Sequence, residues 1–227
     1  MENSRQKIFL FGAGLHAQTC IDALEKQGKY QLVGLIDSVK QIGSLVDGYP
    51  VLGRMDDLAD LASQHNTQTG MIAIGDNWVR YKLHKEIEAC LPGFEFVNII
   101  HPTAVFGKAV ILGKGIFIGA QAFISSHTTI GEFCLVHQKV HLGLHNQLSD
   151  FVSISAGSLT GGMVTIGDYS AITLGVVVHD RLNIGSHTLV GSGSLVTSHL
   201  PDSVVAFGSP AKIIRQRKAG DPYLKNG

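Results

Sequence analysis

Four histidines in the middle of the chain are the residues whose spacing first suggests chemistry. His137, His141 and His145 are four residues apart, and His127 precedes His145 by eighteen. An unprotonated imidazole can act as a general base near neutral pH, and on a helix the four-residue spacing would place three imidazoles on one face as metal ligands. Which chemistry these histidines can do therefore depends on the element that carries them.

That element is defined by an apolar side chain that returns at every sixth position from residue 106 to residue 196. The series has sixteen positions and is interrupted once, at Thr160; glycine often follows the apolar residue, and the fifth place of each hexad is small or β-branched. A period of six is typical of neither a helix nor an alternating strand. It indicates short parallel strands wound into a three-sided coil, with three hexads per turn and about five stacked turns.

The hexad frame separates the histidines. His137, His141 and His145 occupy the second, sixth and fourth places of their hexads, so they point in different directions and a metal triad within one chain is not expected. His127 and His145 share one place in successive turns of the coil and should stack about 4.8 Å apart, the spacing of neighbouring strands. Asn146 falls in the inward fifth place, where a buried amide needs partners. It either bonds to the backbone of the next coil or orients His145.

A second set of candidate residues lies near the N-terminus. The apolar run Lys7–Phe11 ends in the sequence GAGLHA, residues 12–17; Gln18–Gln27 is predicted to be helical, and Gln31–Ile36 is a second strand followed by Asp37. This order is that of a βαβ unit with a GxGxxA turn, in which glycines let the backbone approach a phosphate and the helix N-terminus attracts it. The unit therefore predicts a nucleotide site.

The size of this first part limits what it binds. A further strand is predicted at Met71–Gly75, with Arg80 one helical turn beyond it. About a hundred residues precede the repeat, enough for one mononucleotide-binding half and hardly for the two that NAD needs. We expect an α/β plus all-β protein: a small Rossmann-like domain at residues 1–100 and a coil domain with a C-terminal tail at residues 101–227.

Composition argues against several partners. Eighteen basic residues balance eighteen acidic ones, which removes the electrostatic case for nucleic acid or an anionic membrane. The three cysteines form no CxxC motif, so neither a disulfide framework nor a zinc site is indicated, and Cys134 is expected in the core. The chain shows no signal-peptide core and no apolar run of membrane-spanning length. A cytoplasmic protein is predicted.

The order of several motifs resembles that of a known family. GAGLHA, Asp37, Val51–Gly53, IAIGDN at residues 72–77, Ile99–Ala104, the hexads and Gly208–Lys212 together resemble the nucleotide-sugar N-acetyltransferases of the NeuD and PglD type over nearly the whole chain. The resemblance implies that the coil is a left-handed parallel β-helix and that the protein is a homotrimer. It also implies acetyl-CoA as co-substrate, bound along the β-helix between subunits, and a sugar nucleotide bound to the N-terminal domain.

The same resemblance assigns residues to the nucleotide-sugar site. The positions of this chain that match the family's nucleotide-sugar site are Gly12, Ala13, Gly14, Asp37, Ser38 and Gly75. His16 in the same turn either reaches a phosphate or the sugar, or merely caps its helix. No metal is expected, although the γ-type carbonic anhydrases share this coil and bind zinc between subunits; their chains lack the GAGLHA domain.

The resemblance to the family also implies which residues contact the coenzyme. Ser153, Leu174 and Ser192 fall at the acetyl-CoA-contacting positions, in turns where backbone groups bond to the pantetheine amides. Lys212 and Arg215 lie in a basic tail. They either meet the phosphates of the coenzyme or belong to a solvated charged terminus.

The expected base departs from the family pattern. The family uses a histidine followed by Glu or Asp, whereas an ungapped alignment places Leu144 at the histidine and His145 at its acidic neighbour. Either the turn shifts by one residue and His145 with Asn146 replaces the pair, which we favour, or the base is lost and the proton of the amine passes to solvent. Since an uncharged Asn cannot raise imidazole basicity as a carboxylate does, His145 would be a weaker base.

These features together predict an enzyme that transfers acetyl from acetyl-CoA to the amine of a nucleotide-linked aminosugar, with a 4-amino-4,6-dideoxyhexose as the expected sugar and surface glycan synthesis as the setting. Two alternatives differ in class. One is a sugar O-acetyltransferase of the sialic acid type, and the other is a non-catalytic trimer that binds sugar nucleotides.

Overall fold

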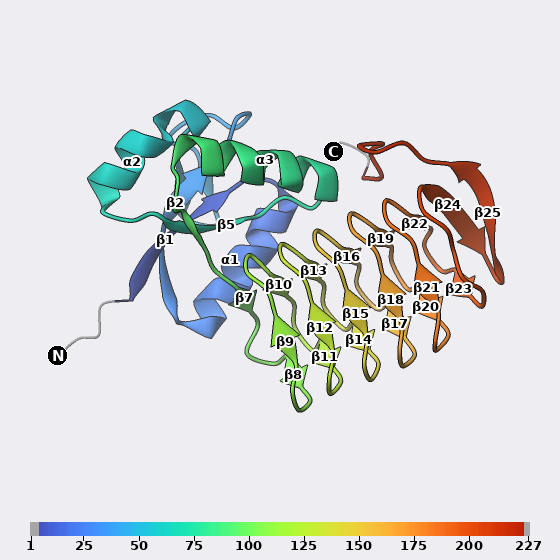
Figure 1. Cartoon of the computed structure of the whole chain (residues 1–227). Helices are drawn as coiled ribbons and strands as arrows, with labels where there is room; N and C mark the ends of the chain where they lie inside the picture. Colours follow the sequence, from blue (N-terminus) through green and yellow to red (C-terminus); the bar gives the residue numbers. More distant parts are fainter. Residues whose placement is uncertain (1–4, 225–227) are drawn as a thin grey trace.

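The computed structural model describes residues 5–224 and consists of an α/β sheet followed by a three-sided coil (Figure 1). The α/β part has a six-stranded sheet in the order β3-β4-β2-β1-β5-β6. Its elements are β1 (Gln6–Phe11), α1 (Leu15–Gln27), β2 (Tyr30–Ile36), β3 (Leu45–Val46), β4 (Tyr49–Gly53), the 3-10 turn η1 (Met55–Asp57), α2 (Leu58–His65), β5 (Thr69–Ile72), α3 (Asn77–Cys90) and β6 (Glu95–Phe96).

Strand β1 is apolar from Ile8 to Phe11 because both of its faces are covered there. Ile8 and Leu10 pack with the buried side of α1, whereas Phe9 and Phe11 pack with α2 and α3 on the other face. Parallel strands with helices on both sides read as continuous apolar runs. Strands β1, β2 and β5 pair in parallel, so their carboxyl ends meet at one edge of the sheet.

Every hexad position carries a strand, which confirms the β-helix. From β7 to β20, each strand pairs in parallel with the strand eighteen residues further on, as Phe117 does with Leu135. The strands are β7 (Ile99–Ile100), β8 (Val105–Phe106), β9 (Ile111–Leu112), β10 (Phe117–Ile118), β11 (Phe123–Ile124), β12 (Thr129–Ile130), β13 (Leu135–Val136), β14 (His141–Leu142), β15 (Gln147–Leu148), β16 (Ser153–Ile154), β17 (Leu159–Thr160), β18 (Thr165–Ile166), β19 (Ala171–Ile172), β20 (Val177–Val178), β21 (Asn183–Ile184), β22 (Leu189–Val190) and β23 (Leu195–Val196).

The left-handed coil has three faces. Strands β7, β10, β13, β16, β19 and β22 form the covered face, which the N-terminal part packs against and which β24 (Val204–Gly208) and β25 (Ala211–Gln216) extend. Strands β8, β11, β14, β17, β20 and β23 form the open face. Strands β9, β12, β15, β18 and β21 form the polar face, so named for the outward side chains of its last four strands. A chain that changes face every six residues presents three turn edges.

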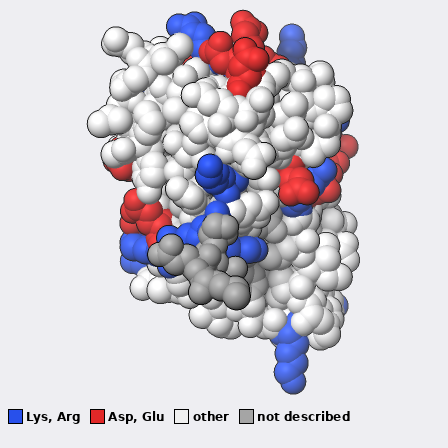
Figure 2. All heavy atoms as spheres, turned by 90° about the vertical axis from the view of Figure 1, so that its left-hand side faces the viewer, with Lys and Arg blue, Asp and Glu red and all other residues white. Residues whose placement is uncertain are grey.

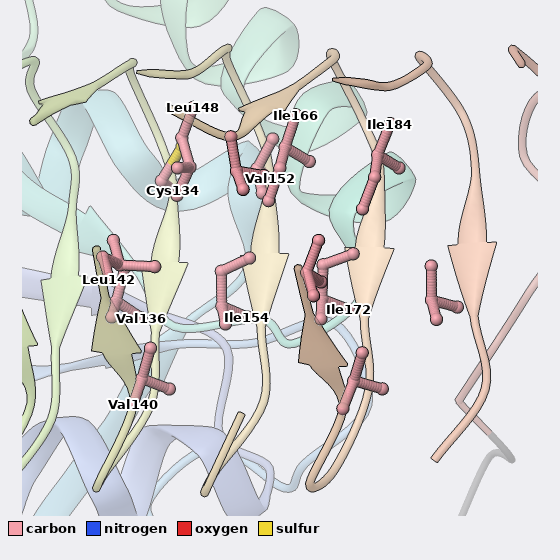
Figure 3. Packing of buried hydrophobic residues seen from close by; sticks show 14 of the residues in the cluster. Cys134, Val136, Val140, Leu142, Leu148, Val152, Ile154, Ile166, Ile172 and Ile184 are labelled. Carbon is pink, nitrogen blue, oxygen red and sulfur yellow. The ribbon is translucent and has the colours of Figure 1, made fainter. Parts of the chain in front are cut away.

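The interior of the coil is filled by the hexad side chains. Val136, Ile154 and Ile172 stack one above the other and meet side chains from the other two faces (Figure 3). Cys134 lies among them, as predicted, and its Sγ donates to the Ser149 carbonyl at 3.0 Å. Glycine after the apolar residue allows successive coils to approach, because a Cβ on Gly143 would lie 2.2 Å from the carbonyl oxygen of Gly161.

One turn edge explains how the two parts are joined. Phe133, Phe151, Tyr169 and His187 form the aromatic edge, between the polar and covered faces, with successive ring centroids 4.9, 5.4 and 4.7 Å apart. Helix α3 runs along this column. Its Tyr81 ring lies 5.5 Å from Phe151, so the helix that follows β5 is held against the coil by aromatic packing.

Charged side chains do not gather into one region on the face shown in Figure 2, where basic and acidic residues lie in small groups near one another. This agrees with the balance of eighteen basic and eighteen acidic residues. Between residues 5 and 224, the helices are all too short or too polar to span a lipid bilayer.

Candidate active site

The GAGLHA turn and Asp37 come together at the carboxyl edge of the sheet. The backbone N–H of Ala13 donates to Asp37 Oδ2 at 2.7 Å, while Asp37 Oδ1 accepts from the N–H groups of Val39 and Lys40, both at 2.8 Å. The carboxylate thus ties the turn after β1 to the turn after β2. Gly12 has φ of 107°, a left-handed conformation that favours glycine.

The end of β5 completes this edge. A Cβ on Gly12 would lie 2.9 Å from Ile74, which shows how closely the first turn approaches the segment leading to Gly75. Asp76 caps α3 by accepting from the N–H groups of Trp78 and Val79, each at 3.0 Å. The residues carried over for the nucleotide-sugar site, including the exposed Ser38, therefore share one edge of the sheet.

His16 lies between this turn and the coil. Helix α1 begins at Leu15, three residues earlier than predicted, and its N-cap is Gly14 without a side-chain hydrogen bond, so His16 does not cap the helix. The imidazole Nε2 lies 3.5 Å from Cys20 Sγ, and the ring packs edge-on against Phe117 of the covered face. Burial, reinforced by nearby His137 and Arg80, lowers the pKa of His16 well below its usual value.

His137 was not predicted as a site residue, yet it is a coil side chain that contacts this turn. Its ring centroid lies 5.2 Å from that of His16 and 5.8 Å from that of Phe117. Burial, with Arg80 acting in the same direction, lowers the pKa of His137 to about 4. Two neutral imidazoles therefore join the nucleotide-binding turn to the β-helix.

His127 and His145 stack as the hexad frame predicted. Their ring centroids are 4.8 Å apart and their planes differ by 7°. Both residues are exposed and have φ near 60°, at the turn between the open and polar faces, which we call the histidine edge. Leu144, at the position aligned with the family's histidine, is exposed beside them.

Asn146 does not support His145. Its side chain is fully buried in the coil, where Oδ1 accepts from the Val164 N–H at 2.8 Å and Nδ2 donates to Thr160 Oγ1. A catalytic role for Asn146 is therefore contradicted, because the fifth place of the hexad points inward and the amide binds the next coil instead.

The predicted coenzyme residues divide between two environments. Leu174 and Ser192 are exposed on successive coils, at the turn edge between the covered and open faces. We call this the glycine edge, because its turns contain Gly157, Gly175 and Gly193. Ser153, in contrast, is 3% exposed and accepts a hydrogen bond from Arg80 Nη2 at 3.1 Å. Because α3 covers it, Ser153 is not open to a coenzyme in this structure.

The tail residues also differ from each other. Lys212 is exposed on β25. Arg215 is exposed as well, but its Nη1 lies 3.3 Å from Asp221 Oδ2, so its charge is already paired within the tail. Surface pairs of this kind contribute at most about 1 kcal/mol, so a phosphate can compete for the guanidinium.

Arg80 is a further residue that the sequence alone did not assign. Its side chain is fully buried. The guanidinium donates to the carbonyls of Ile74 and Gly75, at 2.9 and 3.0 Å. It also donates to the carbonyls of Phe133 and Phe151 in the coil, at 2.8 and 3.2 Å. All of these acceptors, like Ser153 Oγ, are neutral. Arg80 thus fixes the end of β5 to two coils of the aromatic edge.

Between residues 5 and 224, no group of three or more His, Cys, Asp or Glu side chains is placed to hold a metal ion.

A surface hollow lined by Arg5, Gln31 and Thr67 lies at the amino-terminal edge of the sheet, opposite the residues described above. The exposed residues assigned to chemistry lie on the carboxyl edge of the sheet, on two edges of the coil and on β25, whereas Asn146 and Ser153 are buried.

Known proteins combine the same two parts. Residues 7–87 match the family described as the PglD N-terminal domain. The chain is similar to a variant of perosamine N-acetyltransferase from Caulobacter crescentus whose crystal structure contains CoA and GDP-perosamine. The identity is 31%, the match covers 92% of this chain and 97% of that one, and the TM-score is 0.87.

Two further solved structures match the same share of this chain at lower identity. They are the acetyltransferase domain of PglB from Neisseria gonorrhoeae and WeeI from Acinetobacter baumannii. Each is 25% identical to this chain with a TM-score of 0.83, and each match covers 92% of this chain and 100% of the other. The likeness thus extends over both parts of the molecule.

Proposed function

The chain belongs to the nucleotide-sugar N-acetyltransferases of the NeuD and PglD type, and on that premise we propose that it transfers acetyl from acetyl-CoA to the amine of a nucleotide-linked 4-amino-4,6-dideoxyhexose for surface glycan synthesis. The observation that carries the proposal is the joining of a GAGLHA turn, tied to Asp37, to a coil with open edges. GDP-perosamine in the related Caulobacter enzyme supports a sugar of this class.

The nucleotide half of the substrate fits the carboxyl edge of the sheet. Gly12 and Gly14 carry no side chain that would hinder a phosphate, and the N-terminus of α1 attracts negative charge. Asp37 lies where a carboxylate meets the ribose hydroxyls in this type of fold. His16 and His137 mark the direction from this turn toward the coil, where the sugar would extend.

A homotrimer would complete the site, and the open face supports one. Five of the six outward side chains on this face are apolar and uncovered, the exception being His141, which stacks on Phe123. The last four strands of the neighbouring polar face present Thr129, Gln147, Thr165 and Asn183 instead. The exposed fractions are 50% for Val105, 41% for Phe123, 42% for Leu159 and 37% for Val177. An apolar column of this kind is typical of a protein–protein interface.

Threefold packing of the open face would unite the two edges that flank it. In a cyclic trimer each interface is head to tail, so one region of a subunit meets a different region of the next, and the histidine edge of one subunit would face the glycine edge of its neighbour. His145 from one chain and Leu174 and Ser192 from its neighbour would then lie on opposite sides of one cleft. Acetyl-CoA along the glycine edge would present its thioester to that cleft.

Acetyl transfer then needs few groups from the protein. The substrate nitrogen attacks the thioester carbonyl carbon, the C–N bond forms, and the C–S bond breaks. His145 accepts the proton that the nitrogen loses and passes it on to the departing thiolate. Backbone N–H groups of the turns stabilise the oxyanion. Because Asn146 is turned into the core, His145 works without an orienting partner from its own turn.

The reaction is proposed to take place in the cytoplasm. Cys20, Cys90 and Cys134 are all free thiols, two of them buried, and free cysteines are usual in a reducing compartment.

The proposal is tested by incubating the protein with acetyl-CoA and a panel of UDP-, dTDP- and GDP-linked aminosugars and measuring the release of free thiol. Thiol release with an aminosugar, and none with the matching hydroxysugar, supports the N-acetyltransferase over the O-acetyltransferase. No release with any member of the panel contradicts the proposal. If calorimetry then detects sugar-nucleotide binding and no affinity for acetyl-CoA, the chain is a non-catalytic binding trimer.

A further inference from the structure

The C-terminal segment returns to the nucleotide-binding part of the molecule. After β25 the chain passes back along the coils toward the start of α3 (Figure 1). Arg217 marks the change of direction: its N–H donates to the Ser203 carbonyl at 2.7 Å, and its guanidinium donates to the His187 carbonyl at 3.0 Å. Only 5% of Arg217 is exposed, so the segment is anchored in the last coils rather than lying loose on the surface.

The segment has its own internal structure. Arg217 Nη2 donates to the Asp221 carbonyl at 2.8 Å, and its guanidinium lies 5.7 Å from the centre of the Tyr223 ring. Asp221 accepts from the Lys218 N–H at 3.1 Å. These contacts close residues 217–223 into a compact turn, which sets the direction of the tyrosine.

Two contacts bring this turn onto the β5–α3 junction. Gly220, with φ of 81°, lies against the indole of Trp78, where a Cβ would come within 2.8 Å of the ring. Tyr223 Oη donates to the Gly75 carbonyl at 2.9 Å. Gly75 is one of the residues assigned to the nucleotide-sugar site, so the tail touches that site directly.

The Gly75 peptide is thereby held by donors from two sources. Arg80 Nη1 donates to the same carbonyl at 3.0 Å, and the next residue but one, Asn77, donates from Nδ2 to the Tyr169 carbonyl at 2.5 Å. A glycine has no side chain to restrict its backbone, so outside contacts must fix its orientation. Since the peptide bond is planar and trans, fixing the Gly75 carbonyl also directs the N–H of Asp76 to the opposite side, away from the junction.

We propose that residues 217–224 form a clasp and that Tyr223 is a positioning residue for the sugar nucleotide, acting through the Gly75 peptide. The inference rests on the proposed function, because it assumes that a sugar nucleotide binds at Gly75. It assigns a role to the part of the chain that follows the Gly208–Lys212 motif. The hydroxyl of Tyr223 orients the backbone that meets the nucleotide and touches no part of acetyl-CoA.

The test uses the full-length protein and three variants. Tyr223→Phe removes only the hydroxyl, and a chain ending at Gln216 removes the whole clasp. Tyr49→Phe is the matched control, because it removes a hydroxyl that bonds to Glu25 outside the clasp. Calorimetry measures binding of UDP, dTDP and GDP without turnover. Steady-state kinetics then give KM for the sugar nucleotide and for acetyl-CoA, with kcat, and thermal unfolding reports stability.

Loss of one hydrogen bond of this strength corresponds to a change of roughly 3- to 10-fold. We expect Tyr223→Phe to raise Kd for the bound nucleoside diphosphate and KM for its sugar derivative by that factor, with KM for acetyl-CoA and kcat within about twofold. The shortened chain should show a larger loss of nucleotide affinity, and Tyr49→Phe should match the wild type.

Equal nucleotide affinity in the wild type and Tyr223→Phe overturns the inference while leaving the proposed function in place. A fall in kcat and a rise in both KM values, together with a lower Tm, also overturn it, because they would show a general structural role. If the wild type itself binds none of the three nucleotides and acetylates none of their aminosugars, the proposed function fails and the inference fails with it.

Discussion

Asn146 donates a hydrogen bond to Thr160, and each of these two buried residues is an exception at its own place in the repeat. Thr160 interrupts the sixfold apolar series and Asn146 occupies an inward fifth place, yet both are buried on adjacent faces of the coil. Thr160 Oγ1 also accepts from the Gly143 N–H at 3.1 Å. Each of the two side chains therefore supplies a hydrogen-bond partner that the other needs, because buried polar groups must be paired.

Asn146 and Thr160 should contribute to the stability of the protein in a non-additive way. Asn146→Val leaves the Val164 N–H without its acceptor and removes one of the partners of the Thr160 hydroxyl, and we expect a loss of about 2–4 kcal/mol in the free energy of unfolding. The double variant Asn146→Val with Thr160→Val should lose less than the sum of its two single variants. Denaturant unfolding at one protein concentration measures the four values. Simple additivity would show that the two side chains are independent.

Loss of the proposed base should lower the rate far more than the affinity. His145→Ala is expected to reduce kcat by about 10²- to 10⁴-fold, because general base catalysis contributes that much. His127→Ala, which removes the stacked neighbour one coil away, is the matched control and should have a much smaller effect. Thiol release from acetyl-CoA measures both. Near-normal activity in His145→Ala would instead mean that the base lies elsewhere or that solvent takes the proton.

Stability should fall as the pH is lowered from about 6.5 to about 4, because burial lowers the pKa of His137 to about 4. In this range the unfolded histidine, with a pKa near 6.5, binds a proton that the folded one does not. The pKa of His16 is lowered as well, so both residues act in the same direction.

His137→Phe, which keeps a ring against Phe117, should therefore remove roughly 2–3 kcal/mol of this acid sensitivity. Unfolding measured at pH 7 and pH 4.5 for both proteins checks the difference. The same decrease in the wild type and the variant would assign the acid sensitivity to other groups.

A charge on the open face should separate the subunits. Leu159→Asp places a carboxylate in the exposed apolar column and is expected to convert trimers to monomers and abolish acetyl transfer. Thr165→Asp, on the polar face, should leave both unchanged. Light scattering after size-exclusion chromatography gives the mass of each protein. A wild type that elutes as a monomer, or a trimer that survives Leu159→Asp, would contradict this choice of interface.

The coil could be predicted from the sequence in detail, since each hexad places one strand and the same relation recurs every eighteen residues. The stacking of His127 on His145 followed from that relation alone. The carboxyl edge of the sheet was also predictable, because the GAGLHA turn and Asp37 specify local backbone geometry.

What could not be predicted depends on packing between the two parts. Ser153 was assigned to the coenzyme from the resemblance to the family, but α3 covers that position and Arg80 binds its hydroxyl. The recurrence of Phe133, Phe151, Tyr169 and His187 at eighteen-residue intervals was the available signal for this contact. Only the three-dimensional arrangement shows which element lies against it.

The run of α3 along the aromatic edge restricts how many coils the protein can have. Trp78 near the start of the helix meets His187, while His84, two turns later, meets Phe133. Inserting one extra coil after His187 would move the tail about 4.8 Å further from the sheet, a distance that Tyr223 could not cover. The hexad repeat by itself sets no limit on the number of coils. In this chain that number is matched to the length of one helix, α3.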